Sequence, residues 1–305
     1  MRTAMTLSLL AACATTGLLA TPAQAAQIDY KRLYTTAAPA VVLIHSSDGK
    51  IGSQGSGSII DPRGLVLTNT HVITHNGHDW PQINVFLKPS EITGDFKRDL
   101  KKGYAARVVA KHPVWDLALI QILNCRERLP VLALSSLEGV GIGEPTVAIG
   151  HPGGGAPWSL TTGTIGASFQ DMMGKQGWHV FQTETALNPG NSGGPLLDGS
   201  GAVIGVNTFI RRKNNDGLAL VGLNFAVKSS SARAWIHNVL GSLPSASELE
   251  KDNRESRRDR IAGVTARPPE VIVPPRAQVN GQAAPPPAAV APPATHRVPP
   301  PADVA

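Results

Sequence analysis

The sequence predicts an all-β fold of two six-stranded β-barrels, followed by one short helix and a long tail. Three observations lead to it. Between residues 38 and 228, short apolar runs rich in β-branched residues alternate with Gly, Pro, Asn and Asp turns. The runs form two groups of about six, which indicates one barrel for each group. After residue 241 the composition changes to charged residues and then to proline and alanine, so no further core is expected.

The first 25 residues have the pattern of a secretory signal. Arg2 is followed by an apolar stretch over residues 7–19 and then by Ala23-Gln24-Ala25. We expect cleavage after Ala25 and export to the periplasm or beyond. The run Leu10-Ala11-Ala12-Cys13 also fits a lipoprotein cleavage box, which leaves membrane anchoring through Cys13 as the alternative. If the signal is removed after Ala25, no intrachain disulfide can form, and stability must come from packing.

The folded part is expected over residues 26–242, with the first barrel at about 38–125. Its predicted strands are the apolar runs at 41–44, 65–68, 83–87, 107–110 and 117–123. The glycine-rich run at 52–57 lacks the Lys-Ser/Thr pair of a phosphate-binding loop, so we interpret it as a β-turn. Cys125 ends the last strand and is expected to be a half-buried small residue rather than a reactive thiol.

Two ionisable residues stand where strands of this first group end or begin. His71 follows the apolar run 65–68 and its polar continuation, which predicts an imidazole at a strand end. Asp116 directly precedes the apolar run 117–123. An unpaired carboxylate is costly to bury there, so Asp116 needs a partner.

The second barrel is expected over about residues 130–228. Its predicted strands are 146–149, 161–165, 180–185, 196–197, 202–210 and 223–227. The run 150–155 also lacks a phosphate-loop Lys, and we interpret it as a second β-turn. A closing helix is predicted at about 229–240, where apolar residues recur at helical spacing.

Residues 190–195, with the sequence GNSGGP, present one small hydroxyl in a glycine-rich turn. The glycines permit positive φ and close approach, and they leave the amides of Gly190 and Ser192 free to converge as an oxyanion hole. A serine hydroxyl needs a base, which is usually a histidine oriented by a carboxylate. The order His71, Asp116, Ser192 is that of chymotrypsin.

From about residue 38 to 240 the chain resembles the HtrA (Deg) branch of the trypsin-like serine endopeptidases. The motifs that carry the resemblance are 55–60 with 67–73, then 116–120, and then 188–197. The resemblance implies the two-barrel chymotrypsin fold with His71 as general base, Asp116 as orienting acid and Ser192 as nucleophile. The amides of Gly190 and Ser192 would form the oxyanion hole. Typical members carry a PDZ domain after the protease, and this sequence shows none.

The resemblance also implies substrates, a specificity pocket and an assembly. Substrates would be unfolded or exposed polypeptides, and the family leans to homo-trimers. No acidic residue stands where trypsin keeps its aspartate, and no histidine stands where glutamate-specific relatives have one. The pocket should therefore prefer small or medium aliphatic side chains. Its walls would come from Thr185, Ala186, Leu187, Val206, Asn207 and Thr208.

Three other interpretations are weighed against this one. Residues 190–194 also satisfy the G-x-S-x-G pattern of α/β-hydrolases, but a β-branched run follows where that fold needs a helix. His71, His75 and His78 could meet on a helix as metal ligands, but the residues between them are poor helix formers, so neither a metal nor another cofactor is expected. A non-catalytic protein that binds extended peptides by strand addition remains the alternative function.

The net charge of +6 and the pI near 9.5 invite a nucleic-acid interpretation. Basic residues cluster at 97–102 and 211–213, but no aromatic residues interleave with them as stacking platforms, so no nucleic-acid partner is expected. The cluster at 211–213 could favour acidic residues beside the scissile bond. The tail at 243–305 is expected to be disordered, as a tether, a ligand for an adaptor or an inert spacer.

Overall fold

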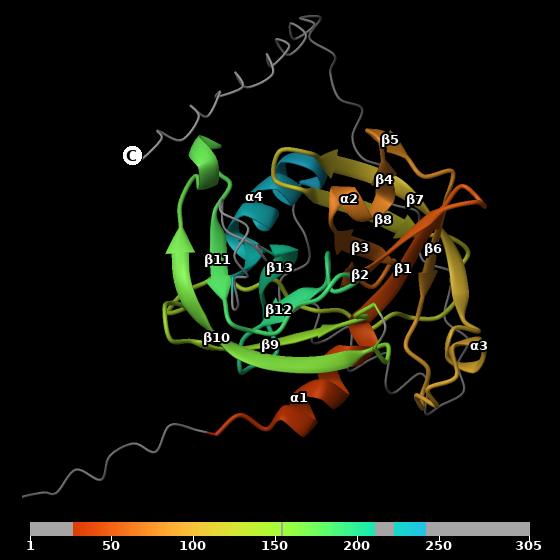
Figure 1. Cartoon of the computed structure of the whole chain (residues 1–305), viewed down its shortest axis with the longest axis horizontal. Coiled ribbons are helices and arrows are strands. Elements are labelled where there is room, and N and C mark those ends of the chain that lie inside the picture. The colour runs from red at the N-terminus through yellow and green to blue at the C-terminus, as the bar shows by residue number, and fades with distance from the viewer. Residues whose placement is uncertain (1–26, 154, 211–222, 242–305) are drawn as a thin grey trace, which may run out of the picture. The chain divides into compact units, whose positions relative to one another are not determined.

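The structure, a computed structural model, describes residues 27–153, 155–210 and 223–241. These residues form two closed antiparallel β-barrels, which Figure 1 shows with the first barrel in orange and yellow and the second in green and teal. The predicted signal segment 1–25, the basic cluster 211–213 and the tail 243–305 lie outside the described residues. No helix in the described part of the chain is both long and apolar enough to cross a membrane.

The first barrel closes in the strand order β1-β2-β3-β8-β7-β6. A helix α1 and a short 3-10 turn η1 lead into it, and α2, a two-stranded hairpin and α3 connect its strands. The bounds are α1 Tyr30–Ala37, η1 Ala38–Ala40, β1 Val41–Ser47, β2 Gly52–Asp61, β3 Leu65–Thr68, α2 Thr70–Ile73, β4 Thr74–His75, β5 His78–Asp79, β6 Gln82–Phe86, α3 Phe96–Asp99, β7 Gly103–His112 and β8 Leu117–Ile122.

The second barrel closes in the order β10-β11-β14-β13-β12-β9, and the helix α4 follows it. Its bounds are β9 Pro145–Gly150, β10 Ser159–Phe169, η2 Met172–Gly174, β11 Val180–Thr183, β12 Pro195–Leu197, β13 Val203–Ile210, β14 Asn224–Lys228 and α4 Ser229–Leu240. The all-β class, the two six-stranded barrels and the closing helix are therefore confirmed.

One hydrophobic cluster joins the two barrels and α4. Leu67 of β3 and Leu119 of β8 pack in it with Val206 of β13, Phe225 of β14 and Trp235 of α4. Each of these side chains is at most 6% exposed, so their burial supplies the apolar area that stabilises the fold. Because one cluster draws on both barrels, their relative position is set by packing as well as by hydrogen bonds.

The interpretation of residues 52–57 as a β-turn is wrong. They form the first part of β2, which pairs with β1 from Val41↔Ser58 to Ser47↔Gly52. The glycines here serve packing rather than chain reversal: a Cβ at Gly55 would lie 2.6 Å from the side chain of Val72. The second predicted turn is present, since the amide of Gly155 donates to the carbonyl of Pro152 at 3.0 Å.

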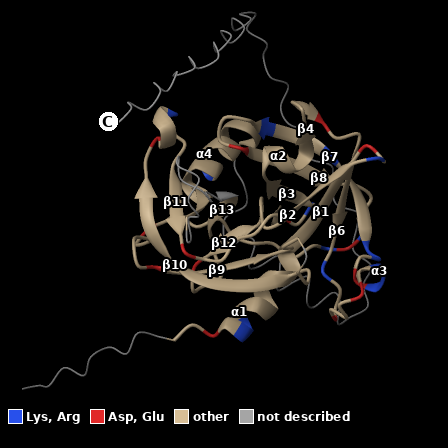
Figure 2. Cartoon of the chain, viewed as in Figure 1, with Lys and Arg blue, Asp and Glu red and all other residues tan. Residues whose placement is uncertain are grey.

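Two elements near the predicted site residues went unpredicted. His71 lies in the short helix α2, three residues after the end of β3. His75 and His78 are paired in the β4-β5 hairpin. The basic residues at 97–102 lie on and just after α3, at the edge of the first barrel (Figure 2). Lys102 among them pairs with Glu127 at 2.9 Å.

Candidate functional site

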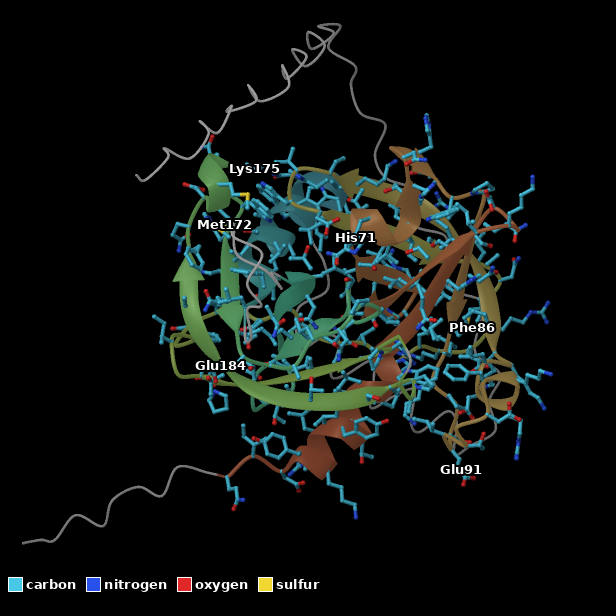
Figure 3. The ribbon with its side chains drawn as sticks, viewed as in Figure 1. His71, Phe86, Glu91, Met172, Lys175 and Glu184 are labelled. Carbon is cyan, nitrogen blue, oxygen red and sulfur yellow. The ribbon has the colours of Figure 1, made fainter. Side chains whose placement is uncertain are left out.

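Strand pairing brings His71 and Asp116 together. Strands β3 and β8 run antiparallel with Thr68 opposite Ala118, so the residues just after β3 lie beside those just before β8. Figure 3 shows His71 near the middle of the view, between the strands of the two barrels, whereas Glu91 and Glu184 lie at the periphery. The side chain of His71 is 49% exposed and that of Asp116 is 23% exposed. The imidazole is therefore open to a substrate, and the carboxylate is largely covered.

The Asp116 carboxylate holds the His71 ring in one orientation. Its Oδ2 lies 2.7 Å from Nδ1 of His71, and its Oδ1 accepts from the His71 backbone amide at 3.0 Å. An ionised carboxylate can only accept, so a neutral His71 must carry its proton on Nδ1 and keep Nε2 free as an acceptor. This is the tautomer that a general base needs.

The backbone of Asp116 is itself tied down. Its φ of 55° lies in the left-handed region, which aspartate tolerates better than most residues. Its carbonyl oxygen accepts from Nδ2 of Asn69 at 2.7 Å and from the amide of Thr70 at 3.3 Å. The residues immediately before His71 therefore fix the position from which the carboxylate reaches the ring.

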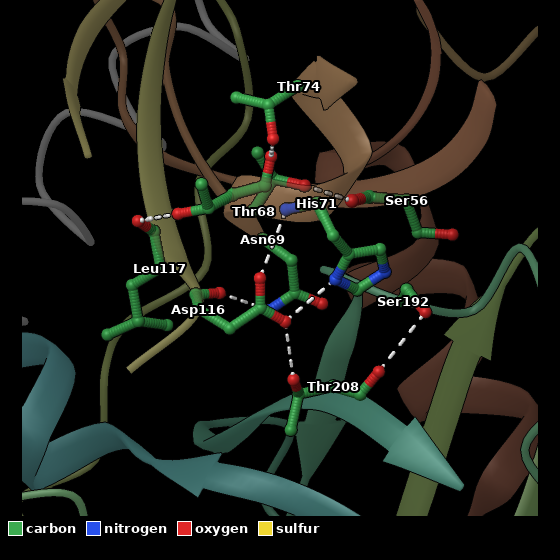
Figure 4. A network of polar contacts seen from close by, with 10 residues as sticks. Ser56, Thr68, Asn69, His71, Thr74, Asp116, Leu117, Ser192 and Thr208 are labelled. Carbon is green, nitrogen blue, oxygen red and sulfur yellow. Dashed lines mark hydrogen bonds and ion pairs between the residues drawn. The ribbon is translucent and has the colours of Figure 1, made fainter. Parts of the chain in front are cut away.

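Thr208 on β13 links Asp116 to the second barrel. Its hydroxyl donates to Oδ2 of Asp116 at 2.7 Å (Figure 4). The resemblance implies a different role for Thr208, as part of a wall of the specificity pocket. No local signal could have found the contact with Asp116, since it depends on β13 docking beside the start of β8.

Ser192 lies in the loop between β11 and β12, close to the same residues. Its Oγ donates to the carbonyl oxygen of Thr208 at 3.3 Å, and among the described residues no hydrogen bond joins it to His71. In the view of Figure 4 the His71 ring lies between the Asp116 carboxylate and the Ser192 side chain. Attack on a carbonyl group would require Ser192 to rotate about its Cα–Cβ bond toward Nε2 of His71.

The predicted oxyanion donors are the backbone amides of Gly190 and Ser192. Within the described ranges, no backbone carbonyl accepts a hydrogen bond from either of them. The carbonyl of Pro189 accepts from the amide of Gly153 at 2.7 Å. In a trans peptide the C=O and N–H point in opposite directions, so this bond turns the Gly190 N–H away from Gly153. Gly190 has a φ of 98°, which suits only glycine well.

Ser56 of β2 anchors the Ser192 loop to the first barrel. Its backbone amide donates to the carbonyl of Ser192 at 2.8 Å, and its hydroxyl donates to the carbonyl of Gly190 at 2.7 Å. The sequence pattern marked this segment only by resemblance. Ser56 and Gly190 are 134 residues apart in the chain, so their contact depends on how the two barrels dock.

The predicted pocket residues separate into two sets. Ala186, shortly before Ser192 in the chain, is exposed, whereas Leu187 is buried at 6% exposed. The other side chains of the group are engaged inside the protein. Thr185 bonds Thr146 at 2.6 Å between their hydroxyls, Asn207 donates from Nδ2 to the carbonyl of Pro195 at 3.0 Å, and Val206 packs in the cluster shared by the two barrels.

Comparison with known proteins identifies relatives over the same region. A family model described as a trypsin-like peptidase domain matches residues 55–206. A probable periplasmic serine endoprotease, DegP-like, of Chlamydia trachomatis is 35% identical over 188 residues, which cover 61% of this chain and 34% of the relative. The serine endoprotease DegS of Salmonella typhimurium is 33% identical over 208 residues, which cover 65% of this chain and 54% of DegS.

A solved structure also resembles this chain. The HtrA-type protease AlgW with a tripeptide matches with a TM-score of 0.55 and 31% sequence identity. The match covers 68% of this chain and 63% of AlgW. The chain thus spans between about a third and about two thirds of the relatives that it matches.

Proposed function

Because this chain belongs to the trypsin-like peptidases of the HtrA type, we propose that it is a serine endopeptidase that cleaves unfolded or exposed polypeptides. We assign to the whole protein the activity that the match at residues 55–206 indicates. It assigns the chemistry to Ser192, His71 and Asp116 through an acyl-enzyme intermediate.

In this mechanism Nε2 of His71 takes the proton of Ser192 as its Oγ attacks the scissile carbonyl carbon. The C–N bond breaks after His71 returns the proton to the leaving amine, which leaves Ser192 acylated. Water, deprotonated by His71, then hydrolyses the ester and restores the serine. Asp116 keeps Nδ1 protonated and stabilises the imidazolium that forms, and the amides of Gly190 and Ser192 bind the oxyanion.

The observation that carries the proposal is the 2.7 Å contact between Nδ1 of His71 and Oδ2 of Asp116, which frees Nε2 on the side of Ser192. Thr208 supports it by donating to the same carboxylate oxygen at 2.7 Å. Among the described residues no backbone carbonyl accepts from the amides of Gly190 or Ser192, which supports the oxyanion hole.

Labelling by a fluorophosphonate probe tests the nucleophile. We expect the purified protein to be labelled and Ser192→Ala not to be, because only an activated serine reacts with the probe. His71→Ala should also abolish labelling, with circular dichroism as the control for folding. A folded wild-type protein that stays unlabelled and cleaves no casein would contradict the proposal and favour a peptide-binding protein instead.

We also propose that cleavage follows small or medium aliphatic residues. Ala186, which is exposed shortly before Ser192 in the chain, supports this preference because it offers an apolar surface without charge. Mass spectrometry of casein digested by the purified protein reads the preference directly. A majority of cleavages after Lys, Arg or Glu would contradict it.

The protein is further proposed to act after export and as a homo-oligomer. The names of the DegP-like relatives place those proteins in the periplasm, which supports export. Cell fractionation tests the location, and light scattering of the purified protein tests for a trimer. Membrane attachment through Cys13 would appear as a palmitate-labelled protein in the membrane fraction.

A further inference from the structure

His151, in the turn after β9, is buried next to the nucleophile loop but plays no part in the mechanism above. It is 1% exposed, and its ring meets that of Trp158 edge-on at 4.7 Å between centroids. Its Nδ1 lies 2.9 Å from Oγ of Ser56, and its backbone amide lies 3.2 Å from the same oxygen. Its Nε2 has no hydrogen-bond partner among the described residues.

The hydrogen bonds around Ser56 determine which ring nitrogen of His151 carries the proton. A serine hydroxyl donates once and accepts up to twice. The proton of Ser56 is committed to the carbonyl of Gly190, which lies 2.7 Å away and can only accept. Both remaining positions on Oγ must then be filled by donors, so Nδ1 of His151 carries its proton and Nε2 does not.

The opposite tautomer would break one contact and leave one buried donor unsatisfied. A bare Nδ1 would draw the Ser56 proton away from Gly190, and a protonated Nε2 would be a buried donor without an acceptor. The pKa of His151 is lowered to about 3 because burial disfavours the charged imidazolium, so the ring stays neutral over the neutral pH range.

The bond from Ser56 reaches the residue that would supply one oxyanion donor. The peptide plane before Gly190 is held by the bond from the amide of Gly153 to the carbonyl of Pro189. The plane after it is held by the bond from Ser56 to the carbonyl of Gly190 and by the amide of Asn191, which donates to the carbonyl of Asn188 at 3.0 Å. The direction of the Gly190 N–H depends on both. Glycine has little resistance of its own to rotation. Loss of the Ser56 contact would leave the plane after Gly190 held by the Asn191 amide alone, so the Gly190 N–H would turn more easily.

We propose that His151 is a positioning residue for the oxyanion hole: by donating from Nδ1 to Ser56 it directs the Ser56 hydroxyl onto the Gly190 carbonyl and so fixes the Gly190 amide. The proposal rests on the proposed peptidase function. His151 touches no reacting atom and acts only through Ser56.

Steady-state kinetics on a peptide substrate test it with paired variants. Ser56→Ala and His151→Leu remove the chain of hydrogen bonds, and we expect kcat to fall on the order of tenfold or more, below the 10²- to 10³-fold cost of losing a whole donor. KM should change by less than about twofold, because the loss is confined to the transition state. His151→Asn retains an N–H donor near the position of Nδ1 and should restore most of kcat.

Ser58→Ala is the matched control. Ser58 lies two residues further along β2 and is also buried, at 2% exposed, so its truncation costs similar packing without touching the Gly190 carbonyl. We expect its kcat to stay near that of the wild type. Equal kcat values for Ser56→Ala, Ser58→Ala and the wild type would overturn the proposal.

Nitrogen-15 NMR of the histidine rings gives a readout independent of activity. In the full-length Ser192→Ala protein we expect the His151 ring, assigned by its absence from a protein that also carries His151→Asn, to bear its proton on Nδ1. In a protein that also carries Ser56→Ala this preference should weaken. A proton on Nε2 would overturn the proposal, whereas an unlabelled, inactive wild type would overturn the peptidase function on which it rests.

Discussion

At the scale of single residues, the site depends on side chains that hold others in place. Asp116 orients His71, and Thr208 in turn donates to Asp116 at 2.7 Å. In a similar way, His151 contacts Ser56, and Ser56 donates to the loop that carries Ser192. The group expected to react is thus surrounded by residues whose removal should change rate more than affinity.

Thr208→Val tests the contact to Asp116. Valine keeps the shape of threonine but cannot donate, so the carboxylate loses one of its hydrogen bonds. A hydrogen bond to a charged group contributes about 1.5–3 kcal/mol, and we expect kcat to fall roughly tenfold or more with KM nearly unchanged. Thr162→Val, on the exposed part of β10, is the control. A Thr208→Val enzyme as fast as this control would mean that the bond does not matter for turnover.

His151 should make the protein sensitive to acid. Its pKa is lowered to about 3 in the folded state by burial, whereas a histidine in an unfolded chain has a pKa of about 6.5. Between these values the unfolded state binds a proton that the native state does not. The free energy of unfolding should therefore fall on acidification, by up to about 1.4 kcal/mol per pH unit from this residue.

Urea unfolding from about pH 7 to about pH 4 measures this effect. The wild type should lose stability more steeply than His151→Asn over that range. His112, whose pKa is also lowered by burial, contributes equally to both proteins and cancels in the comparison. Parallel curves for the two proteins would show that His151 is not the source.

At the scale of elements, the loop between β11 and β12 packs closely against the first barrel. A Cβ at Gly193 would lie 2.1 Å from Oγ1 of Thr68 and 2.4 Å from the carbonyl oxygen of Ser56. The amide of Gly193 donates to the carbonyl of Asn207 at 2.7 Å, so the loop cannot move aside without losing a bond.

Gly193→Ala and Gly49→Ala separate crowding from backbone strain. Both glycines have positive φ, 81° and 89°, but a Cβ at Gly49 would meet nothing within 4 Å. We expect Gly49→Ala to cost about 1–2 kcal/mol for the left-handed conformation alone. Gly193→Ala should cost a further 1–3 kcal/mol or so from overpacking. Urea unfolding measures both, and equal losses would mean that the close approach is relieved without cost.

At the scale of the whole molecule, the two barrels share a core. Leu67 and Leu119 come from the first barrel, Val206 and Phe225 from the second, and Trp235 from α4, all in one cluster. Since neither barrel can lose its part of the cluster without exposing the other's, we expect the described part of the chain to unfold in one transition.

Leu119→Ala tests this coupling. Leu119 is fully buried, and truncation of such a leucine costs about 2–5 kcal/mol. Although the change lies in the first barrel, amide hydrogen exchange should accelerate in peptides from β1 and from β11 alike. Faster exchange in the first barrel only would show that the barrels unfold separately.

The sequence determined much of this architecture, because the signals involved are local. The run 65–68 and β3 coincide, as do the predicted helix and α4, since apolar periodicity and turn residues act within a few positions. The motifs around Ser192, His71 and Asp116 are also short segments, so they could be recognised along the chain. Helix α2 is a single turn, which is too short to produce a helical pattern in the sequence. The start of β2 is rich in glycine, a composition that is typical of turns, so it was not predicted as a strand.

Only the tertiary structure decided which residues support the site. The contacts of Thr208 with Asp116, of Ser56 with Gly190 and of Ser56 with His151 join positions 92, 134 and 95 residues apart. Each depends on how strands of one barrel dock against loops of the other, and no pattern along the chain encodes that distance. The tautomer of His151 is decided in the same way, because a proton settles where neighbours from distant segments leave it an acceptor.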